Sequence, residues 1–103
     1  MEQIERIQEM ERCLDVCEDA VRGLSEALSA YEEARSAYRK LSDYYGSDLW
    51  MRDYEDDEAG KLPRDLKRGV LSEDGVYDLL TENRELMVRM LKLVTAALEA
   101  DER

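Results

Sequence analysis

The sequence contains no histidine and no phenylalanine, only one proline, and far fewer basic than acidic residues. Histidine is the commonest general base in enzymes, and Ser/His and Cys/His nucleophilic sites depend on it. The 15 Lys and Arg residues against 26 Asp and Glu residues give a formal net charge of -11 at pH 7. Phosphate binding requires clustered cations, so this balance argues against DNA, RNA or an anionic membrane as a direct partner. A basic protein partner is compatible with the same charge.

Cysteine is also scarce, and no long apolar run occurs. Cys13 and Cys17 are the only cysteines, and their spacing of four in a helical pattern indicates reduced, packed thiols. One chain cannot supply four nitrogen and sulfur ligands for a zinc ion, so we expect no cofactor of this kind. No stretch approaches 18 consecutive apolar residues, and the N-terminus lacks the features of a signal peptide. We therefore expect a cytoplasmic protein that does not bind membranes.

The first part of the chain carries a seven-residue repeat of apolar side chains. Two sets of positions, offset by three and four residues, form the a/d seam of a coiled coil and predict a helix over about residues 2–45. The first set comprises Ile7, Leu14, Val21 and Leu28, and the second comprises Met10, Cys17, Leu24, Tyr31, Tyr38 and Tyr45.

A second, short helix is predicted over residues 48–58. Gly46 is suited to end the first helix, and Ser47 can cap the second by accepting a hydrogen bond from a backbone N–H. Gly60 and Pro63 then interrupt the helical pattern, so residues 59–71 are predicted to form an ordered loop.

The last helix is predicted over about residues 73–100. Ser72 is its expected N-cap, and Leu71 and Val76 stand at the two positions of a hydrophobic staple. A wide apolar stripe follows along this helix and is interrupted by Asn83.

Together these elements predict an all-α fold in a single domain over residues 1–103. The predicted architecture is an antiparallel helical hairpin with a long first helix, a short middle helix plus ordered loop, and a long last helix. Two arms of unequal length leave much of both apolar stripes exposed. We therefore expect two chains to pair as a homodimer in a helical bundle.

The stretch from Trp50 to Leu80 is the most specific part of the sequence, because it holds the only tryptophan, the only proline and adjacent acidic and basic runs. Aromatic residues beside arginines are typical of interface hot spots, but also of a packed hairpin end. The basic run can likewise pair internally with the acidic run. The residues predicted to bind a protein partner are Trp50, Asp53, Tyr54, Asp57, Arg64, Lys67 and Arg68.

The same stretch carries a resemblance to a known family. The run from Tyr44 to Leu80 reads YYGSDLWMRDYEDDEAGKLPRDLKRGVLSEDGVYDLL. It resembles a small bacterial family known as a domain of unknown function, numbered 4298, and the helical flanks are similar as well. The resemblance therefore covers nearly the whole chain. It implies a bacterial, soluble, mostly helical protein and supplies no activity, cofactor or catalytic residue.

A metal site is the weaker alternative for the acidic residues. Hard cations such as Mg²⁺ need several oxygen ligands, and Asp53, Asp57, Glu82 and Glu85 are the candidates. Glu82 and Glu85 share one helical face because they are three residues apart. However, consecutive carboxylates on a helix point in different directions, and the spacing is not that of an EF-hand. A solvated acidic face is the simpler interpretation.

Three functions remain open on the sequence. The first is a non-enzymatic interaction or scaffold module that self-associates through its seam and presents residues 50–80 to a protein partner. The second is a divalent-metal-dependent enzyme acting on a phosphorylated small molecule. The third is an acidic inhibitor or immunity-type protein that masks a basic surface.

Overall fold

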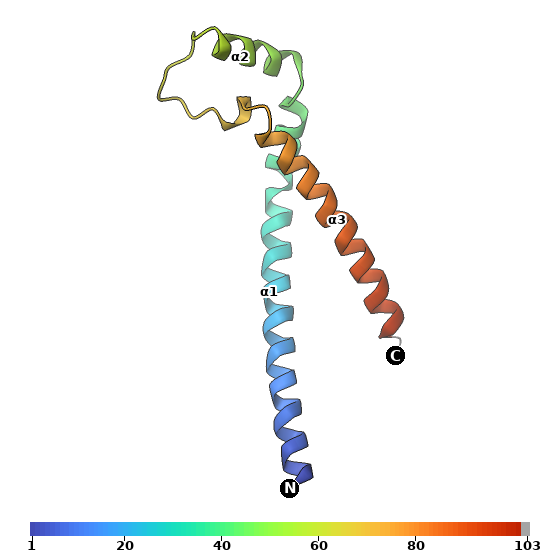
Figure 1. Cartoon of the computed structure of the whole chain (residues 1–103). Coiled ribbons are helices and arrows are strands. Elements are labelled where there is room, and N and C mark those ends of the chain that lie inside the picture. The colour runs from blue at the N-terminus through green and yellow to red at the C-terminus, as the bar shows by residue number, and fades with distance from the viewer. Residues whose placement is uncertain (102–103) are drawn as a thin grey trace. The chain divides into compact units, whose positions relative to one another are not determined.

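The structure, a computed structural model, describes residues 1–101, and all of its regular elements are helical (Figure 1). Helix α1 spans Glu2–Tyr44, α2 spans Asp48–Glu58, and α3 spans Gly75–Ala100. A 3-10 turn, η1, spans Gly69–Leu71 between α2 and α3. The described residues contain no strand. The prediction of an all-α fold with long first and last helices is therefore confirmed.

By its internal contacts the chain divides into two units, one ending at Tyr38 and the other beginning at Arg39. Helix α1 runs through this boundary without a break. The first unit is helical from Glu2 onward, and the second holds the end of α1, α2, η1 and α3. The antiparallel hairpin, the single domain and the dimeric bundle stay predictions.

The first unit has no buried side chain among its residues. The predicted seam is open to solvent: Ile7, Leu14 and Leu24 are 51%, 50% and 56% exposed. Cys13 and Cys17 are free thiols, and both are exposed. The expectation that they are packed is wrong for the single chain, because a regular helix by itself cannot cover its own apolar face.

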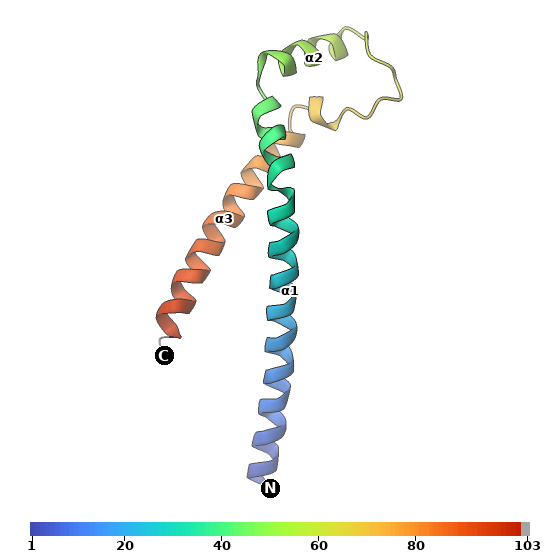
Figure 2. The same ribbon diagram turned by 180° about the vertical axis from the view of Figure 1, so that it is seen from behind.

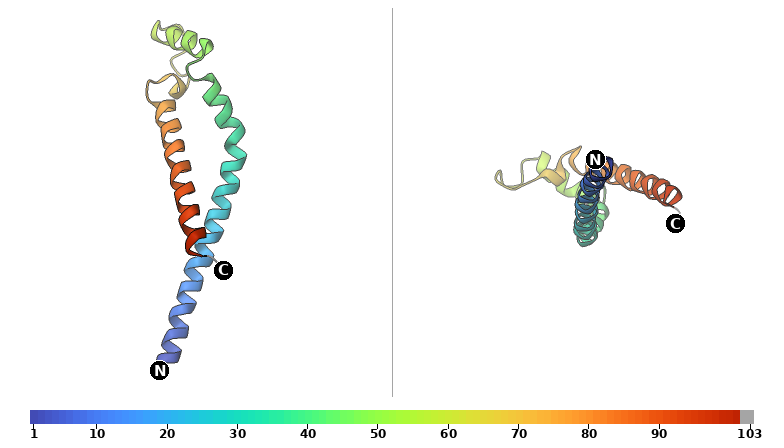
Figure 3. Two further views of the ribbon diagram at one scale, coloured as in Figure 1. Left: turned by 90° about the vertical axis from the view of Figure 1, so that its right-hand side faces the viewer. Right: turned by 90° about the horizontal axis from the view of Figure 1, so that it is seen from below.

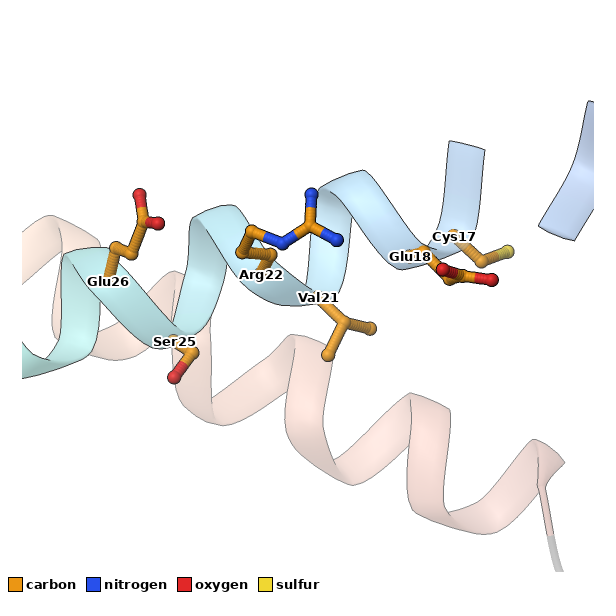
Figure 4. Close-up of a pocket in the computed structure, with 6 residues that line it drawn as sticks. All are labelled: Cys17, Glu18, Val21, Arg22, Ser25 and Glu26. Carbon is orange, nitrogen blue, oxygen red and sulfur yellow. The ribbon is translucent and has the colours of Figure 1, made fainter. Parts of the chain in front are cut away.

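A hollow on α1 lies beside this seam. Figure 4 shows Val21 and Ser25 on one side of the helix and Arg22 and Glu26 on the other. Arg22 pairs with Asp19 at 3.2 Å on the exposed side. Cys17 and Val21 belong to the seam, so the hollow borders the uncovered apolar face.

The small core of the second unit is built around Leu71 and Val76, the pair predicted as a hydrophobic staple. They do not hold the N′ and N4 positions of a staple, because the N-cap of α3 is Asp74. Leu71 and Val76 are 7% and 4% exposed, and they are the buried residues of the described chain. Leu71 ends η1, and Val76 lies in the first turn of α3. Element η1 contacts both α2 and α3 (Figures 2 and 3). This buried pair therefore lies where the end of the loop meets the two helices.

Helix α3 begins at Gly75, two residues later than the sequence indicated. Residues Glu73 and Asp74 form a turn, because Ser72 is engaged with the preceding η1. The Ser72 hydroxyl donates to the Gly69 carbonyl at 2.8 Å and accepts from the Gly75 N–H at 3.1 Å. Ser72 thus does satisfy a backbone donor at the start of α3.

Two glycines in left-handed conformations shape the turns around α2. Gly46 has a φ of +80° and Gly60 a φ of +74°, values that side chains with a Cβ rarely adopt. Gly46 follows the end of α1, as predicted, and Gly60 follows the end of α2. The loop after Gly60 (yellow in Figure 1) carries a turn at Arg64 and Asp65, and its last residues form the 3-10 turn at Gly69–Leu71.

No helix in the described part of the chain is long and apolar enough to cross a membrane.

Candidate functional site

Trp50 lies at the centre of an aromatic cluster on α2. Ser47 is the N-cap of this helix, as predicted, and its hydroxyl accepts a hydrogen bond from the Trp50 N–H at 3.2 Å. Tyr45 meets the Trp50 ring edge-on, with centroids 5.2 Å apart, and Tyr54 stacks on it at 5.3 Å. The indole Nε1–H donates to the Val70 carbonyl at 2.8 Å. Trp50 therefore joins α2 to η1, and its polar atom is already used.

Asp53, the second predicted partner residue, joins α2 to the end of α1. Its carboxylate accepts a hydrogen bond of 2.6 Å from the Tyr44 hydroxyl. Burial of the phenol raises the pKa of Tyr44 to about 12, and the hydrogen bond to Asp53 and its negative charge act in the same direction. This contact spans the turn at Gly46 and fixes the angle at which α2 leaves α1.

Arg68 ties the loop to α2, as the internal interpretation of the basic run predicted. Its guanidinium forms an ion pair with Asp57, and both side chains are partly buried. It also donates to the carbonyls of Pro63 and Leu66, within the loop itself. One planar cation with several donors thus pairs with Asp57 and also binds two loop carbonyls.

A weaker ion pair lies beside it. Lys61 Nζ is 3.8 Å from Asp56 Oδ1, and the two side chains are 69% and 40% exposed. An exposed pair at this distance contributes about 0–1 kcal/mol. Arg68, not Lys61, is therefore the residue that orders the loop.

Tyr54 borders a pocket of about 350 Å³ whose rim is acidic. The nearby negative charge of Glu58 raises the pKa of Tyr54, and partial desolvation and Glu73 add to the effect. The sequence analysis missed Glu58 and Glu73. Glu58 could have been identified from sequence, because residues four apart on one helix, such as Tyr54 and Glu58, are neighbours.

Arg64 and Lys67 differ from the other predicted partner residues, because both are exposed and neither forms an ion pair within the described chain. They flank Leu66, which is 47% exposed, and Val70 lies close by in η1 at 39%. Lys67 and Val70 also line a hollow of about 450 Å³ with Leu41, Gly69, Gly75, Val76 and Leu79. We call the patch of Arg64, Leu66, Lys67 and Val70 the loop surface.

The acids of the metal alternative are not gathered into a site. Asp53 bonds to Tyr44, and Asp57 pairs with Arg68. Among residues 1–101, no three His, Cys, Asp or Glu side chains form a group able to hold a metal ion. The pair Glu82 and Glu85 consequently lacks the second acidic pair that such a site needs.

The structure therefore separates the seven predicted partner residues into two groups. Trp50, Asp53, Asp57 and Arg68 hold α2, the loop and η1 together, and Tyr54 stacks on Trp50. Arg64 and Lys67 present free cations at the surface of the same unit. The first group supports the loop, and the second is exposed to solvent.

Comparison with known proteins gives one result for nearly the whole chain. A family model described as Domain of unknown function (DUF4298) matches residues 7–93. This match covers most of the sequence, and the chain belongs to that family. Searches of curated proteins and of solved structures found no match.

Proposed function

We propose that this member of the DUF4298 family is a non-enzymatic interaction module, which self-associates through the α1 seam and presents the loop surface to a protein partner. The observation that carries this proposal is the extent of uncovered apolar side chains on α1 and α3. They include Ile4, Ile7, Met10, Leu14, Val21, Leu24 and Leu28 on α1, and Leu79, Leu86, Leu91, Leu93, Val94 and Leu98 on α3.

The burial within one chain is small for a protein of this length. Only Leu71 and Val76 are buried among the described residues, and two such side chains contribute about 3–6 kcal/mol. Most of the stability of a helix in water comes from packing its apolar face. A chain with two long helices and so little core gains that packing by association. A monomeric soluble protein also rarely exposes apolar patches this extensive.

The loop surface has the composition of a docking site for a protein. Leu66 and Val70 provide an exposed apolar centre, and Arg64 and Lys67 provide a polar rim. Interfaces commonly combine a fully desolvated apolar centre with a charged rim that sets orientation and association rate. The contacts of Trp50, Asp53 and Arg68 order this surface in advance, which lowers the entropy cost of binding.

The cytoplasm is the proposed location. Two free thiols on an exposed helix face are compatible with a reducing compartment, where cysteines stay unpaired.

Sedimentation of the wild type and two variants tests self-association. Leu24→Asp places a charge in the seam, whereas Ser29→Asp places the same charge on α1 outside it. We expect the wild type and Ser29→Asp to sediment as dimers, with a melting temperature that rises with protein concentration. Leu24→Asp should dissociate or unfold. A fully folded monomeric wild type at micromolar concentration would remove the proposal.

A further inference from the structure

The two flanks of the α1 seam differ in a way that bears on how a second copy pairs with it. With Ile7 at heptad position a, one flank (position g) begins with Arg6 and continues with small side chains. The other flank (position e) is acidic over most of its length. The g residues are Arg6, Cys13, Ala20, Ala27 and Ala34, and the e residues are Glu11, Glu18, Ser25 and Glu32.

We propose that the occupant of this seam is a second copy of α1, aligned parallel and in register over residues 7–31. This inference rests on the proposed self-association and specifies its geometry. Each copy contributes the same eight seam side chains, so that every layer pairs a residue with itself. The layers are Ile7, Met10, Leu14, Cys17, Val21, Leu24, Leu28 and Tyr31.

Charge complementarity favours the parallel alignment. In a parallel coiled coil, a g residue lies beside the e residue five positions later in the other helix. Arg6 then meets Glu11 of the second copy, and the symmetry of the dimer makes this pair twice. Arg6 and Glu11 are both exposed, and neither forms an ion pair within the described chain. The remaining g residues along residues 7–31 are Cys or Ala, so no like charges face each other there.

The antiparallel alignment of the same residues lacks these pairs. If Ile7 lies opposite Tyr31 of the second copy, the two-fold axis passes near residue 19. Position e then faces position e, which brings Glu18 close to Glu18 of the second copy. Arg6 would lie beside Ala34 and gain no partner. Like charges opposed at an interface select against that arrangement.

Single-cysteine cross-linking distinguishes these arrangements. The first variant, Cys13→Ser, keeps only Cys17, and the second, Cys13→Ser/Cys17→Ser/Ile7→Cys, has its only thiol at residue 7. A control, Cys13→Ser/Cys17→Ser/Glu26→Cys, carries its thiol on the outer face of α1. Each full-length variant is held in a glutathione redox buffer, and the disulfide-linked dimer is measured by intact mass. Circular dichroism and sedimentation report folding and association of the same samples.

In the parallel dimer we expect both seam variants to form the disulfide-linked dimer at least tenfold faster than the control. In the antiparallel dimer the two residue-7 thiols would be about 36 Å apart, at 1.5 Å per residue, too far for a disulfide. Dimers that link at residue 7 no faster than the control would therefore overturn the parallel alignment and leave self-association standing. Folded monomers in sedimentation would overturn both. Cys17 lies close to the two-fold axis of the antiparallel dimer, so the Cys13→Ser variant reports association and not alignment. If the substitution of Ile7 prevents folding, Cys13→Ser/Cys17→Ser/Met10→Cys gives the same test, because its thiols would be about 27 Å apart in the antiparallel dimer.

Discussion

The Tyr44 hydroxyl donates a 2.6 Å hydrogen bond to the Asp53 carboxylate, and this bond joins the last turn of α1 to the middle of α2. Both residues are partly buried, and α2 has few other contacts with α1 that could fix its direction. The bond therefore helps to orient α2, which carries Trp50 and Tyr54, relative to the last turn of α1. Because Tyr44 is titratable, the contribution of the bond to stability depends on pH.

The first prediction concerns alkaline pH. The pKa of Tyr44 is raised from 10.0 to about 12 in the folded protein, so the folded state holds its proton more tightly than the unfolded state. The stabilisation from this group is complete below pH 10 and is lost as the pH rises through 12. Tyr44→Phe should cost about 1 kcal/mol at pH 7 and should show a smaller loss of stability between pH 10 and 12. Urea unfolding at a fixed protein concentration measures both quantities.

Tyr77→Phe is the matched control for this titration, because Tyr77 is 59% exposed on α3. It removes a phenol without removing the contact to Asp53. A stability profile of Tyr44→Phe that runs parallel to those of the wild type and Tyr77→Phe above pH 10 would contradict the assigned role of the hydrogen bond.

The second prediction compares the two ion pairs of the acidic run. Arg68→Ala removes the partner of Asp57 and the donor to two loop carbonyls, and should lower stability by about 1–2 kcal/mol. Lys61→Ala removes only the exposed 3.8 Å pair with Asp56 and should change stability by less than about 0.5 kcal/mol. Hydrogen exchange should also become faster at the loop amides in Arg68→Ala. Equal effects of the two substitutions would argue against Arg68 as the residue that orders the loop.

The third prediction contrasts two glycines. A Cβ added to Gly75 would lie 2.6 Å from Ser72 Oγ and 2.9 Å from the Gly69 carbonyl oxygen, so Gly75→Ala must displace η1 from α3. We expect a loss of about 1–3 kcal/mol, typical of overpacking. A Cβ added to Gly23, inside α1, meets nothing within 4 Å. Gly23→Ala should therefore stabilise the protein by about 1 kcal/mol through helix propensity. Thermal unfolding of the two variants at one concentration measures the contrast, and a stabilised Gly75→Ala would contradict the packing at Ser72.

The elements that sequence analysis located well are those fixed by local chemistry. Ser47 caps α2 and Gly46 follows α1 in the conformation that glycine adopts freely, so the bounds of α2 follow from neighbouring residues. Leu71 and Val76 are buried as a pair, but the staple positions assigned to them were wrong because they were counted from a helix start at Ser72. The start of α3 was less accurate. The Ser72 hydroxyl bonds both to the Gly69 carbonyl in η1 and to the Gly75 N–H of α3. No local sequence pattern predicted the bond to η1, which is why the predicted start of α3 was too early.

The candidate site was located but its roles were not resolved from sequence. Trp50 and Asp53 have the residue types of a contact surface, and only the three-dimensional path of the turn shows that Val70 and Tyr44 occupy their polar atoms. These partners are separated by twenty and nine residues, and no local pattern encodes such contacts. Glu73 was overlooked as a neighbour of Tyr54 for the same reason.

The last prediction uses this division of roles to test the loop surface. Arg64→Glu/Lys67→Glu reverses two exposed cations that form no ion pair within the described chain, so the melting temperature should change by no more than a few degrees. If these cations contact a partner, the variant should lose most of the partner recovered by the wild type from extracts of the native source. The matched variant Arg39→Glu/Lys40→Glu makes the same charge change on α1 and should retain the partner. Because rim cations act mainly through electrostatic attraction, recovery by the wild type should also decline as salt is raised. Equal recovery by the two double variants would exclude Arg64 and Lys67 from the interface.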